Sequence, residues 1–262
     1  MTNPTGTPIW FEYLGRDLDA ATRFYADVVG WTVADSGMGD ATGMTYLIAT
    51  APDGDAVAGM MTNPMPDAQP TWLVYFGVKD VDAAVESLSA AGARVQLPAT
   101  TMEGVGRMAM LADPQGAAFY VMRGDSEEDS RAFVDHRHGD VTGHGVWVEL
   151  AAPDDKAAIA FYTGHLGLVQ AGAMPMGPLG DYSFIQAGNT GVGAIMPVVM
   201  NARPGWQPYW GTEDIDAAVD RLKAAGGTLI QGPDEIPGGN FAVVAEDPAG
   251  ARFGFSGPRK GA

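Results

Sequence analysis

The chain has 262 residues, 46% of them hydrophobic, with a formal net charge of −17 and no cysteine. This length is enough for two domains that each bury their own core. The negative charge argues against nucleic acid and anionic membranes as partners, and the absence of cysteine excludes disulfides, thiolate metal sites and a cysteine nucleophile.

No apolar run approaches the ~20 residues of a membrane helix, and residues 1–8 are polar and lack the regions of a signal peptide. We therefore expect a cytoplasmic protein.

The first predicted repeat begins with a short strand at Trp10, followed by Asp17, an Ala-rich helix containing Phe-Tyr25, and Gly30. Aspartate before a helix is a preferred N-cap, and glycine after it is a preferred C-terminal cap. Segments of alternating polarity follow and predict strands. The pattern predicts one βαβββ repeat.

The same pattern recurs three times. The second repeat has a strand from Trp72, an N-cap at Asp80 and a C-terminal cap at Gly92. Residues 124–143, which follow this repeat, are polar and are predicted to form a linker. The third and fourth repeats begin near Trp147 and Trp206. Their N-caps are Asp154 or Asp155 in the third and Asp214 in the fourth, and Gly167 and Gly226 follow the helices.

The third repeat resembles the first, with Trp147 following Trp10 by 137 residues, and the fourth resembles the second, with Asp214 following Asp80 by 134. Self-similarity of this kind indicates a duplicated fold. We predict an α+β protein in which four βαβββ repeats pair into two cup-shaped sheets. The predicted domains are residues 1–123 and 144–262, joined by the linker 124–143.

Two features of the repeats carry a resemblance to a known family: the strand–Asp–helix segments with Phe-Tyr and Gly-Trp31 or Gly-Leu168, and the Asp-Pro-x-Gly turns at Asp113 and Asp247. The chain resembles the vicinal oxygen chelate superfamily of glyoxalases, bleomycin-resistance proteins and extradiol dioxygenases. It is most similar to the two-domain glyoxalase-like members. The resemblance implies cups that hold a divalent metal through His, Glu or Gln on the first and last strands of the repeats.

The residues at the implied ligand positions do not suit a metal. The first-strand positions hold Trp10, Leu73, Trp147 and Gln207, and the last-strand positions hold Tyr120, Gly254 and, more loosely, Gly59 and Ala194. Only Gln207 is a plausible ligand, and one neutral amide cannot hold a hard divalent ion. The histidines lie in or beside the linker (His136, His138 and His144) or at a helix end (His165). We therefore expect neither a metal nor another cofactor.

Strand alternation predicts which side chains line the cups. A cup rich in Trp and Tyr suits an aromatic or polyketide-like ligand, and methionines near the rims adapt to varied shapes. Such side chains can also simply fill the cup as a core. Trp72 and Trp206 turn to the other face. The predicted ligand-binding residues are Trp10, Met60, Tyr75, Tyr120, Trp147, Gln207 and Tyr209.

Glu12 and Glu149 occupy matched inward positions on the first strands of the first and third repeats. A partly desolvated carboxylate beside Trp has a raised pKa and can act as a general acid or base. The alternative is a buried Glu that holds the sheet together through hydrogen bonds.

Two functions follow from this pattern, both with a small organic molecule as partner. One is a metal-independent lyase or isomerase in specialised metabolism, in which Glu12 or Glu149 moves a proton during isomerisation, dehydration or ring opening. The other is a non-catalytic binding or resistance protein. A third, weaker hypothesis is a protein-interaction module whose cups no longer bind a ligand. Four repeats in one chain make a monomer feasible, and a homodimer is the alternative.

Overall fold

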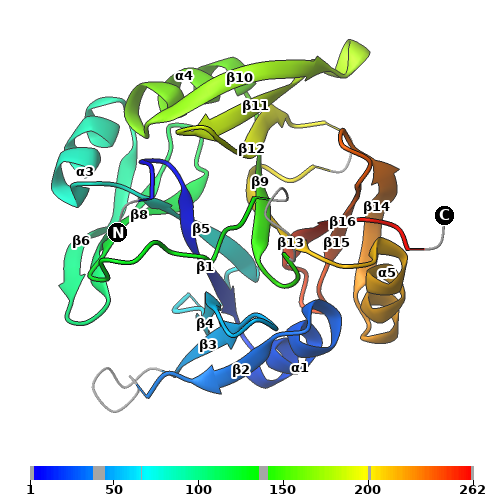
Figure 1. Ribbon diagram of the computed structural model, residues 1–262. Coiled ribbons are helices and arrows are strands. Elements are labelled where there is room, and N and C mark those ends of the chain that lie inside the picture. The colour runs from blue at the N-terminus through cyan, green and yellow to red at the C-terminus, as the bar shows by residue number, and fades with distance from the viewer. Residues whose placement is uncertain (1–2, 38–44, 66, 136–140, 200–201, 261–262) are drawn as a thin grey trace. The chain divides into compact units, whose positions relative to one another are not determined.

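The computed structural model describes residues 3–37, 45–65, 67–135, 141–199 and 202–260 (Figure 1). His136 and His138 lie outside these residues. In the first half, two strand–helix–three-strand repeats follow one another: β1(Pro8–Gly15), α1(Leu18–Val29), β2(Thr32–Asp35), β3(Tyr46–Thr50) and β4(Ala56–Thr62), then β5(Thr71–Gly77), α3(Val81–Ala90), β6(Arg94–Met102), β7(Gly106–Ala112) and β8(Ala118–Gly124).

The second half has the same order of helices and strands, and a turn of 3-10 helix lies between two of its strands. Its elements are β9(Gly145–Ala152), α4(Asp155–His165), β10(Leu168–Pro175), η2(Gly177–Leu179), β11(Asp181–Ala187) and β12(Thr190–Pro197), then β13(Gly205–Gly211), α5(Ile215–Ala224), β14(Thr228–Glu235), β15(Phe241–Glu246) and β16(Arg252–Gly257). The prediction of four βαβββ repeats is confirmed.

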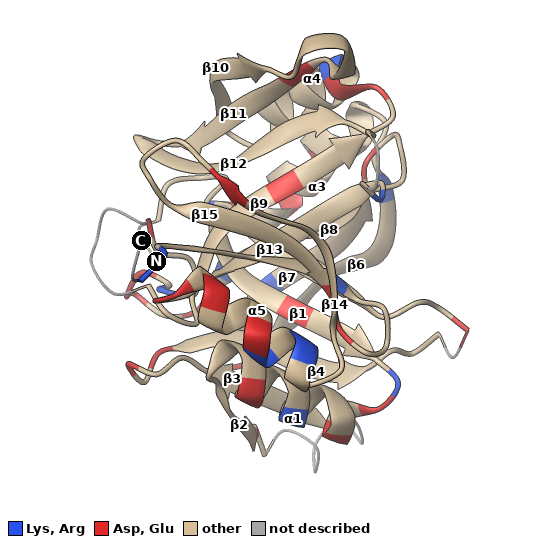
Figure 2. Ribbon diagram, turned by 90° about the vertical axis from the view of Figure 1, so that its right-hand side faces the viewer, with Lys and Arg blue, Asp and Glu red and all other residues tan. Residues whose placement is uncertain are grey.

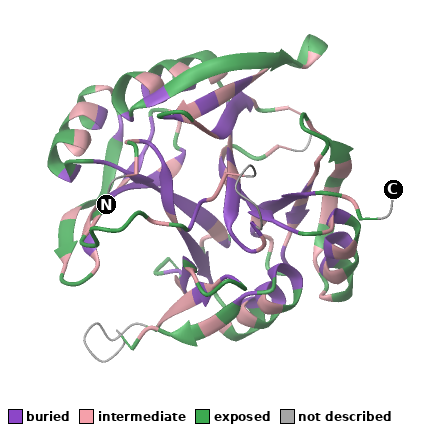
Figure 3. Cartoon of the chain, viewed as in Figure 1, coloured by how far each residue is buried: buried purple, intermediate pink, exposed green. Residues whose placement is uncertain are grey.

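The strands form two open eight-stranded sheets, in the orders β2-β3-β4-β1-β5-β8-β7-β6 and β10-β11-β12-β9-β13-β16-β15-β14. Within each repeat the first strand pairs in parallel with the last, and the remaining pairs are antiparallel. The outer strands β2, β6 and β10 are largely exposed and mostly green in Figure 3, and the outer strand β14 is a mixture of exposed and half-buried residues. The α+β fold class is confirmed.

The predicted aspartates begin the helices. Asp17, Asp80, Asp154 and Asp214 each accept a hydrogen bond from the backbone N–H three residues later. The N-cap of α4 is therefore Asp154 and not the alternative, Asp155. Gly30 caps α1 with φ 88°, in the left-handed region that glycine adopts without strain. The solvent sides of α1 and α5 carry acidic residues (Figure 2).

The residue contacts divide the chain into two compact units. The first consists of Met1–Ile9, Leu73–Ser130 and Val148–Trp206, and the second of Trp10–Trp72, Arg131–Trp147 and Gln207–Ala262. The first unit therefore contains most of the second and third repeats, and the second unit most of the first and fourth.

In the second unit a buried aromatic core joins the helix of the first repeat to the fourth repeat. Trp72 Nε1 donates to the Tyr25 hydroxyl, which donates to Asp247 Oδ2 (2.9 and 3.2 Å). Burial, strengthened by the Asp247 charge, raises the pKa of Tyr25 well above its ordinary value. Phe253 packs on Tyr25, which shows that β16 turns this side chain toward the helix.

The first unit repeats this arrangement. Trp206 Nε1 donates to Tyr162 OH, and Tyr162 donates to Asp113 Oδ2 (3.0 and 3.1 Å). Asp113 Oδ1 also accepts the N–H groups of Gln115 and Ala117 and so closes the Asp-Pro-Gln-Gly turn. Trp72 and Trp206 thus face the helices, as strand alternation predicts. We call the opposite side of the strands the inner face.

Candidate functional site

The inner face of the first repeat carries a short hydrogen-bond chain. Trp10 Nε1 donates to the Tyr46 hydroxyl at 3.1 Å, and Tyr46 donates to Glu12 Oε2 at 3.3 Å. Glu12 is only 3% exposed. Gly59 lies opposite Glu12 in the register, and a Cβ there would stand 1.9 Å from the Tyr46 oxygen. The missing side chain of Gly59 therefore makes room for the tyrosine that holds Glu12.

The third repeat has a matching carboxylate–tyrosine pair. Tyr182 on β11 donates to Glu149 Oε2 at 2.9 Å. Ala194 lies opposite Glu149, where the first repeat has glycine. Glu149 is partly exposed, unlike Glu12. The same Glu–Tyr pairing therefore exists twice, once more buried and once more accessible.

Neither tyrosine is among the residues predicted from the sequence. Tyr46 and Tyr182 lie on the second of the three strands that follow the helix, 136 residues apart, which is close to the spacing of the glutamates. That repeat spacing, together with their position on alternating strands, is the signal that could have revealed them.

The inner face of the second repeat is filled by two predicted ligand-binding residues. Tyr75 and Tyr120 stack with ring centroids 4.0 Å apart and an interplanar angle of 5°, and both are buried. Neighbouring strands hold them in register as a pair. Their flat faces are thus turned to each other.

Met60 lies elsewhere than expected. It pairs in register with Tyr13, whose side chain reaches toward Asp247 and the helix, and it is fully buried. Because paired residues of neighbouring strands point to the same side, Met60 belongs to the core between sheet and helix and does not reach the inner face.

The remaining predicted residues gather in the second compact unit. Tyr209 forms a buried cluster with Val141 and Val146, and Trp147 packs against this cluster. Gln207 lies two residues before Tyr209 on β13 and shares its face. Its Nε2 is buried without a hydrogen-bond partner among the described residues.

The structure gives no reason to place a divalent metal at the positions implied by the family. Trp10 uses its only polar atom on Tyr46, Tyr120 is stacked on Tyr75, and Gly254 has no side chain. These residues do not fit a metal that needs several oxygen or imidazole donors.

A cluster of Asp53, Asp55 and His144 has donor atoms within 4.8 Å of one another. Its polar groups already have partners: His144 Nδ1 meets the Arg131 carbonyl and Nε2 meets Asp53, while the Arg131 guanidinium bonds Asp55. The pKa of Asp53 is lowered. Desolvation opposes this shift but is outweighed by the Asp55 N–H, His144 and Arg131. The cluster therefore ties the chain near the linker to the β3–β4 turn. His165, at the end of α4, contacts Ser87.

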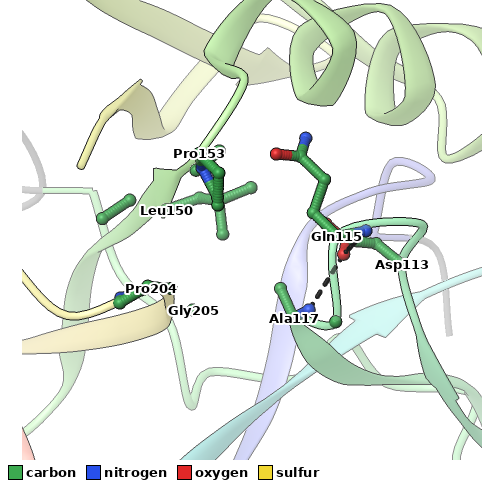
Figure 4. Close-up of a pocket in the computed structure, with 10 residues that line it drawn as sticks. Asp113, Gln115, Ala117, Leu150, Pro153, Pro204 and Gly205 are labelled. Atoms are coloured by element: carbon green, nitrogen blue, oxygen red, sulfur yellow. Dashed lines mark hydrogen bonds between the residues drawn. The ribbon is translucent and has the colours of Figure 1, made fainter.

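A cavity of about 70 Å³ lies in the first compact unit (Figure 4), and none of the predicted site residues lines it. The turn Asp113–Ala117 faces Leu150, Pro153, Pro204 and Gly205 across it. The residue of the first repeat that corresponds to Leu150 is Tyr13, whose hydroxyl donates to Asp247 at 3.0 Å. The shorter leucine thus accounts for the space beside Asp113.

The fold and the repeats identify the family once the chain is compared with known proteins. A family model described as Glyoxalase/Bleomycin resistance protein/Dioxygenase superfamily matches residues 8–121 and again residues 145–255. The chain belongs to this superfamily. The resemblance predicted from the sequence is confirmed.

Several known proteins are similar to nearly the whole chain. "Putative glyoxylase CFP32" of Mycobacterium bovis is 34% identical over 95% of this chain and 93% of its own length. "Anthracycline biosynthesis protein DnrV" of Streptomyces peucetius is 32% identical over 98% and 94%. The Mn(II)-bound glyoxalase from Novosphingobium aromaticivorans shares the fold with a TM-score of 0.68 and 20% identity, over 97% of this chain and 83% of that one.

Proposed function

We propose that this glyoxalase-like protein binds a small, largely apolar organic molecule without a metal ion, and that Glu12 and Glu149 transfer a proton to or from it. The observation that carries the proposal is the repeated Glu–Tyr pair. In each, a tyrosine hydroxyl donates to a glutamate carboxylate on the inner face. Such a hydrogen bond orients the carboxylate, and an oriented carboxylate can remove a proton from one ligand atom and return it to another.

Metal independence is supported by the side chains at the positions where the superfamily holds its ligands. Trp, Leu, Tyr, Gly and Ala offer no set of donors there, Gln207 offers a single neutral amide, and the indole of Trp10 donates to Tyr46 instead. The proposal therefore places the chemistry on carboxylates.

An apolar, aromatic ligand is supported by the character of the inner faces and by the relatives. Trp10, Trp147 and Tyr209 supply flat apolar surface. Two relatives from Streptomyces, DnrV and DauV, are named for anthracycline biosynthesis. We propose a ligand of this general kind. The net charge of −17 and the absence of cysteine support a small-molecule partner and a reducing compartment such as the cytoplasm.

A second candidate function is binding without catalysis. Glu12 is 3% exposed, and burial of this degree suits a carboxylate that supports the sheet. Under this alternative the Glu–Tyr pairs are structural, and the protein sequesters or carries its ligand.

Glutamate-to-glutamine variants separate the two functions. The ligand is sought by screening aromatic polyketides for binding to the native protein and for conversion by mass spectrometry. We expect Glu12→Gln with Glu149→Gln to keep the affinity within about threefold and to lower turnover by at least ~10²-fold, the usual contribution of a general acid or base. Glu128→Gln, at an exposed residue after β8, is the matched control.

The alternative predicts a different result. If no compound that binds is converted by the native protein, the catalytic part of the proposal is wrong and binding alone stands. Stoichiometric Zn, Fe, Mn or Ni in the purified protein would contradict metal independence.

A further inference from the structure

The two buried aspartates of the Asp-Pro-x-Gly turns differ in the number of hydroxyl groups that they accept. Asp247 Oδ2 accepts two hydroxyl donors, Tyr13 at 3.0 Å and Tyr25 at 3.2 Å. Among the described residues, Asp113 Oδ2 accepts only one, Tyr162 at 3.1 Å. The carboxylates are otherwise alike, because each Oδ1 atom accepts two backbone N–H groups of its own turn. Asp113 therefore has room at Oδ2 for one more hydroxyl donor.

The place of this second donor is a cavity. The residue of β9 that corresponds to Tyr13 is Leu150, which has no hydroxyl and lines the cavity of about 70 Å³ beside Asp113. A cavity needs only ~10–15 Å³ to hold one water molecule. This cavity therefore has room for a larger group.

The cavity runs from an exposed rim to a buried floor. Figure 4 shows Gln115 on one side of it and three residues on the other, Leu150, Pro153 and Pro204. The two prolines are exposed, whereas Asp113 is 1% exposed and Leu150 is fully buried. A molecule from solvent can thus enter between the prolines and Gln115 and reach the carboxylate.

Gln115 holds the rim in place. Its side-chain amide donates to the Asp154 carbonyl at 2.8 Å, and its side-chain oxygen accepts the Asp154 N–H at 2.7 Å. The corresponding residue of the other turn is Ala249, which has no amide and cannot form such a bridge. The bridge fixes the turn relative to the start of α4. A cavity that is already formed costs a ligand less binding free energy than one that must open.

The chemistry of the cavity favours a hydroxyl group. A hydroxyl group donates its one proton to Asp113, whereas an ammonium group would leave two further donors in apolar surroundings. The side-chain donors that reach the Oδ2 atoms of the two turns are all tyrosine hydroxyls. The walls beside the carboxylate are apolar: Ala117, Leu150, Ala152, Pro153 and Pro204.

We infer that the cavity beside Asp113 is a binding site for a small alcohol or phenol, whose hydroxyl group donates to Asp113 Oδ2 as the Tyr13 hydroxyl donates to Asp247. The apolar part of the ligand lies against Leu150 and points to the rim. This site is separate from the Glu–Tyr pairs, because Leu150 follows Glu149 on β9 and successive side chains of a strand point to opposite faces. The inference does not depend on the proposed function.

Amide signals of the two turns report binding, because the N–H groups of Ala117 and Ala251 donate to the two aspartates. Phenol and fluorobenzene, which are nearly equal in size, are titrated into the native protein and followed by ¹H–¹⁵N spectra. We expect phenol to shift the Ala117 signal and to leave the Ala251 signal in place, because Tyr13 fills the second turn. Fluorobenzene has no hydroxyl donor and should bind at least about tenfold more weakly, the value of a hydrogen bond to a charged group.

Two variants that fill the cavity test the location of the site. Leu150→Tyr with Ala152→Gly supplies a phenol from the chain itself, and Ala152→Val adds two methyl groups to the wall. We expect neither variant to show the Ala117 shift at phenol concentrations that saturate the native protein, and the dispersion of each spectrum shows whether the variant is folded. Ala171→Val, at an exposed residue of β10, is the matched control and should bind phenol as the native protein does.

Several outcomes would overturn the inference. Equal binding of phenol and fluorobenzene would show that Asp113 does not accept the hydroxyl, and equal shifts of Ala117 and Ala251 would show unspecific binding. Unchanged phenol binding in both folded variants would place the ligand elsewhere. Tighter binding of methylammonium chloride than of phenol would assign the cavity to a cation, and the absence of any shift with phenol would show that it holds water only. None of these results bears on the inner faces, so the proposed function stands or fails separately.

Discussion

The buried tyrosines show how single residues hold this fold together. Tyr25 and Tyr162 each accept a hydrogen bond from a tryptophan and donate one to an aspartate of an Asp-Pro-x-Gly turn. Tyr13 adds a second donor to Asp247. Each hydroxyl is buried and hydrogen-bonded to protein groups, so its loss or ionisation disturbs both of its neighbours.

The pKa shifts of these tyrosines predict alkaline unfolding. Burial first, and then the nearby aspartate, raise the pKa of Tyr13, Tyr25 and Tyr162 above the ordinary value of 10.0. Above pH 10 the unfolded chain loses these protons and the folded chain keeps them, so stability is full below pH 10 and falls as the pH rises. Each tyrosine contributes a slope of about 1.4 kcal/mol per pH unit.

Urea unfolding at pH 8 to 11 measures this dependence. The Tyr162→Phe variant lacks one of the three groups, and its stability should fall less steeply above pH 10 by about 1.4 kcal/mol per pH unit. Parallel curves for the variant and the native protein would show that Tyr162 is not protonated preferentially in the folded state.

At the scale of secondary-structure elements, matched strands of the repeats differ in how they fill the space beside the Asp-Pro-x-Gly turn. On β1 the Tyr13 ring lies so close to Gly15 that a Cβ there would be 2.2 Å from it. On β9 the matched residues are Leu150 and Ala152, both of which line the cavity of about 70 Å³ beside Asp113. The large Tyr13 on β1 thus requires a glycine two positions later, whereas the smaller Leu150 on β9 leaves room for an alanine there.

This comparison predicts a stabilising double substitution. Leu150→Tyr with Ala152→Gly places a phenol in the cavity and gives Asp113 a second hydroxyl donor, as Tyr13 does for Asp247. We expect the free energy of unfolding to rise by about 1 kcal/mol, the net value of one buried hydrogen bond. Thermal and urea unfolding check the change.

The single variant Leu150→Tyr is the control. The Cβ of Ala152 would clash with the new ring, so the single variant should be less stable than the native protein. A double variant no more stable than the single one would show that the cavity does not match the space of Tyr13.

At the scale of the whole molecule, the sequence halves and the compact units do not coincide. The family model matches residues 8–121 and 145–255, whereas each compact unit draws residues from both halves. In the second unit, Tyr25 of the first half donates to Asp247 of the second half, and Phe24 packs on Phe253. Each half therefore completes its core with residues of the other. The predicted boundaries at 123 and 144 stay a prediction about the sequence repeat.

The exchange of core residues predicts that the halves fold together. Residues 1–123 and 124–262 produced separately are each expected to lack a cooperative thermal transition, because Tyr25 and Tyr162 lose their aspartate partners. Mixing the two fragments should restore the transition and the near-ultraviolet circular dichroism of the native chain. Cooperative unfolding of either fragment alone would contradict this expectation.

Much of the fold could be predicted because its signals are local. Helix caps at Asp17, Asp80 and Asp214, the Asp-Pro-x-Gly turns and the repeat spacing all depend on residues close together in sequence, and the structure agrees with each. The site was less predictable. The partners of the glutamates, Tyr46 and Tyr182, are 34 and 33 residues away from them, and only strand pairing shows that they meet.

The four repeats and the superfamily could be recognised from the sequence alone, because both depend on residue types at fixed spacings. The three-dimensional structure was needed to show that Met60 faces the helix and that Tyr75 and Tyr120 fill one inner face. It was also needed to show that Gln207 Nε2 is buried without a hydrogen-bond partner among the described residues. The reason is physical: strand register and the packing of side chains distant in sequence decide which groups meet and which stay unpaired.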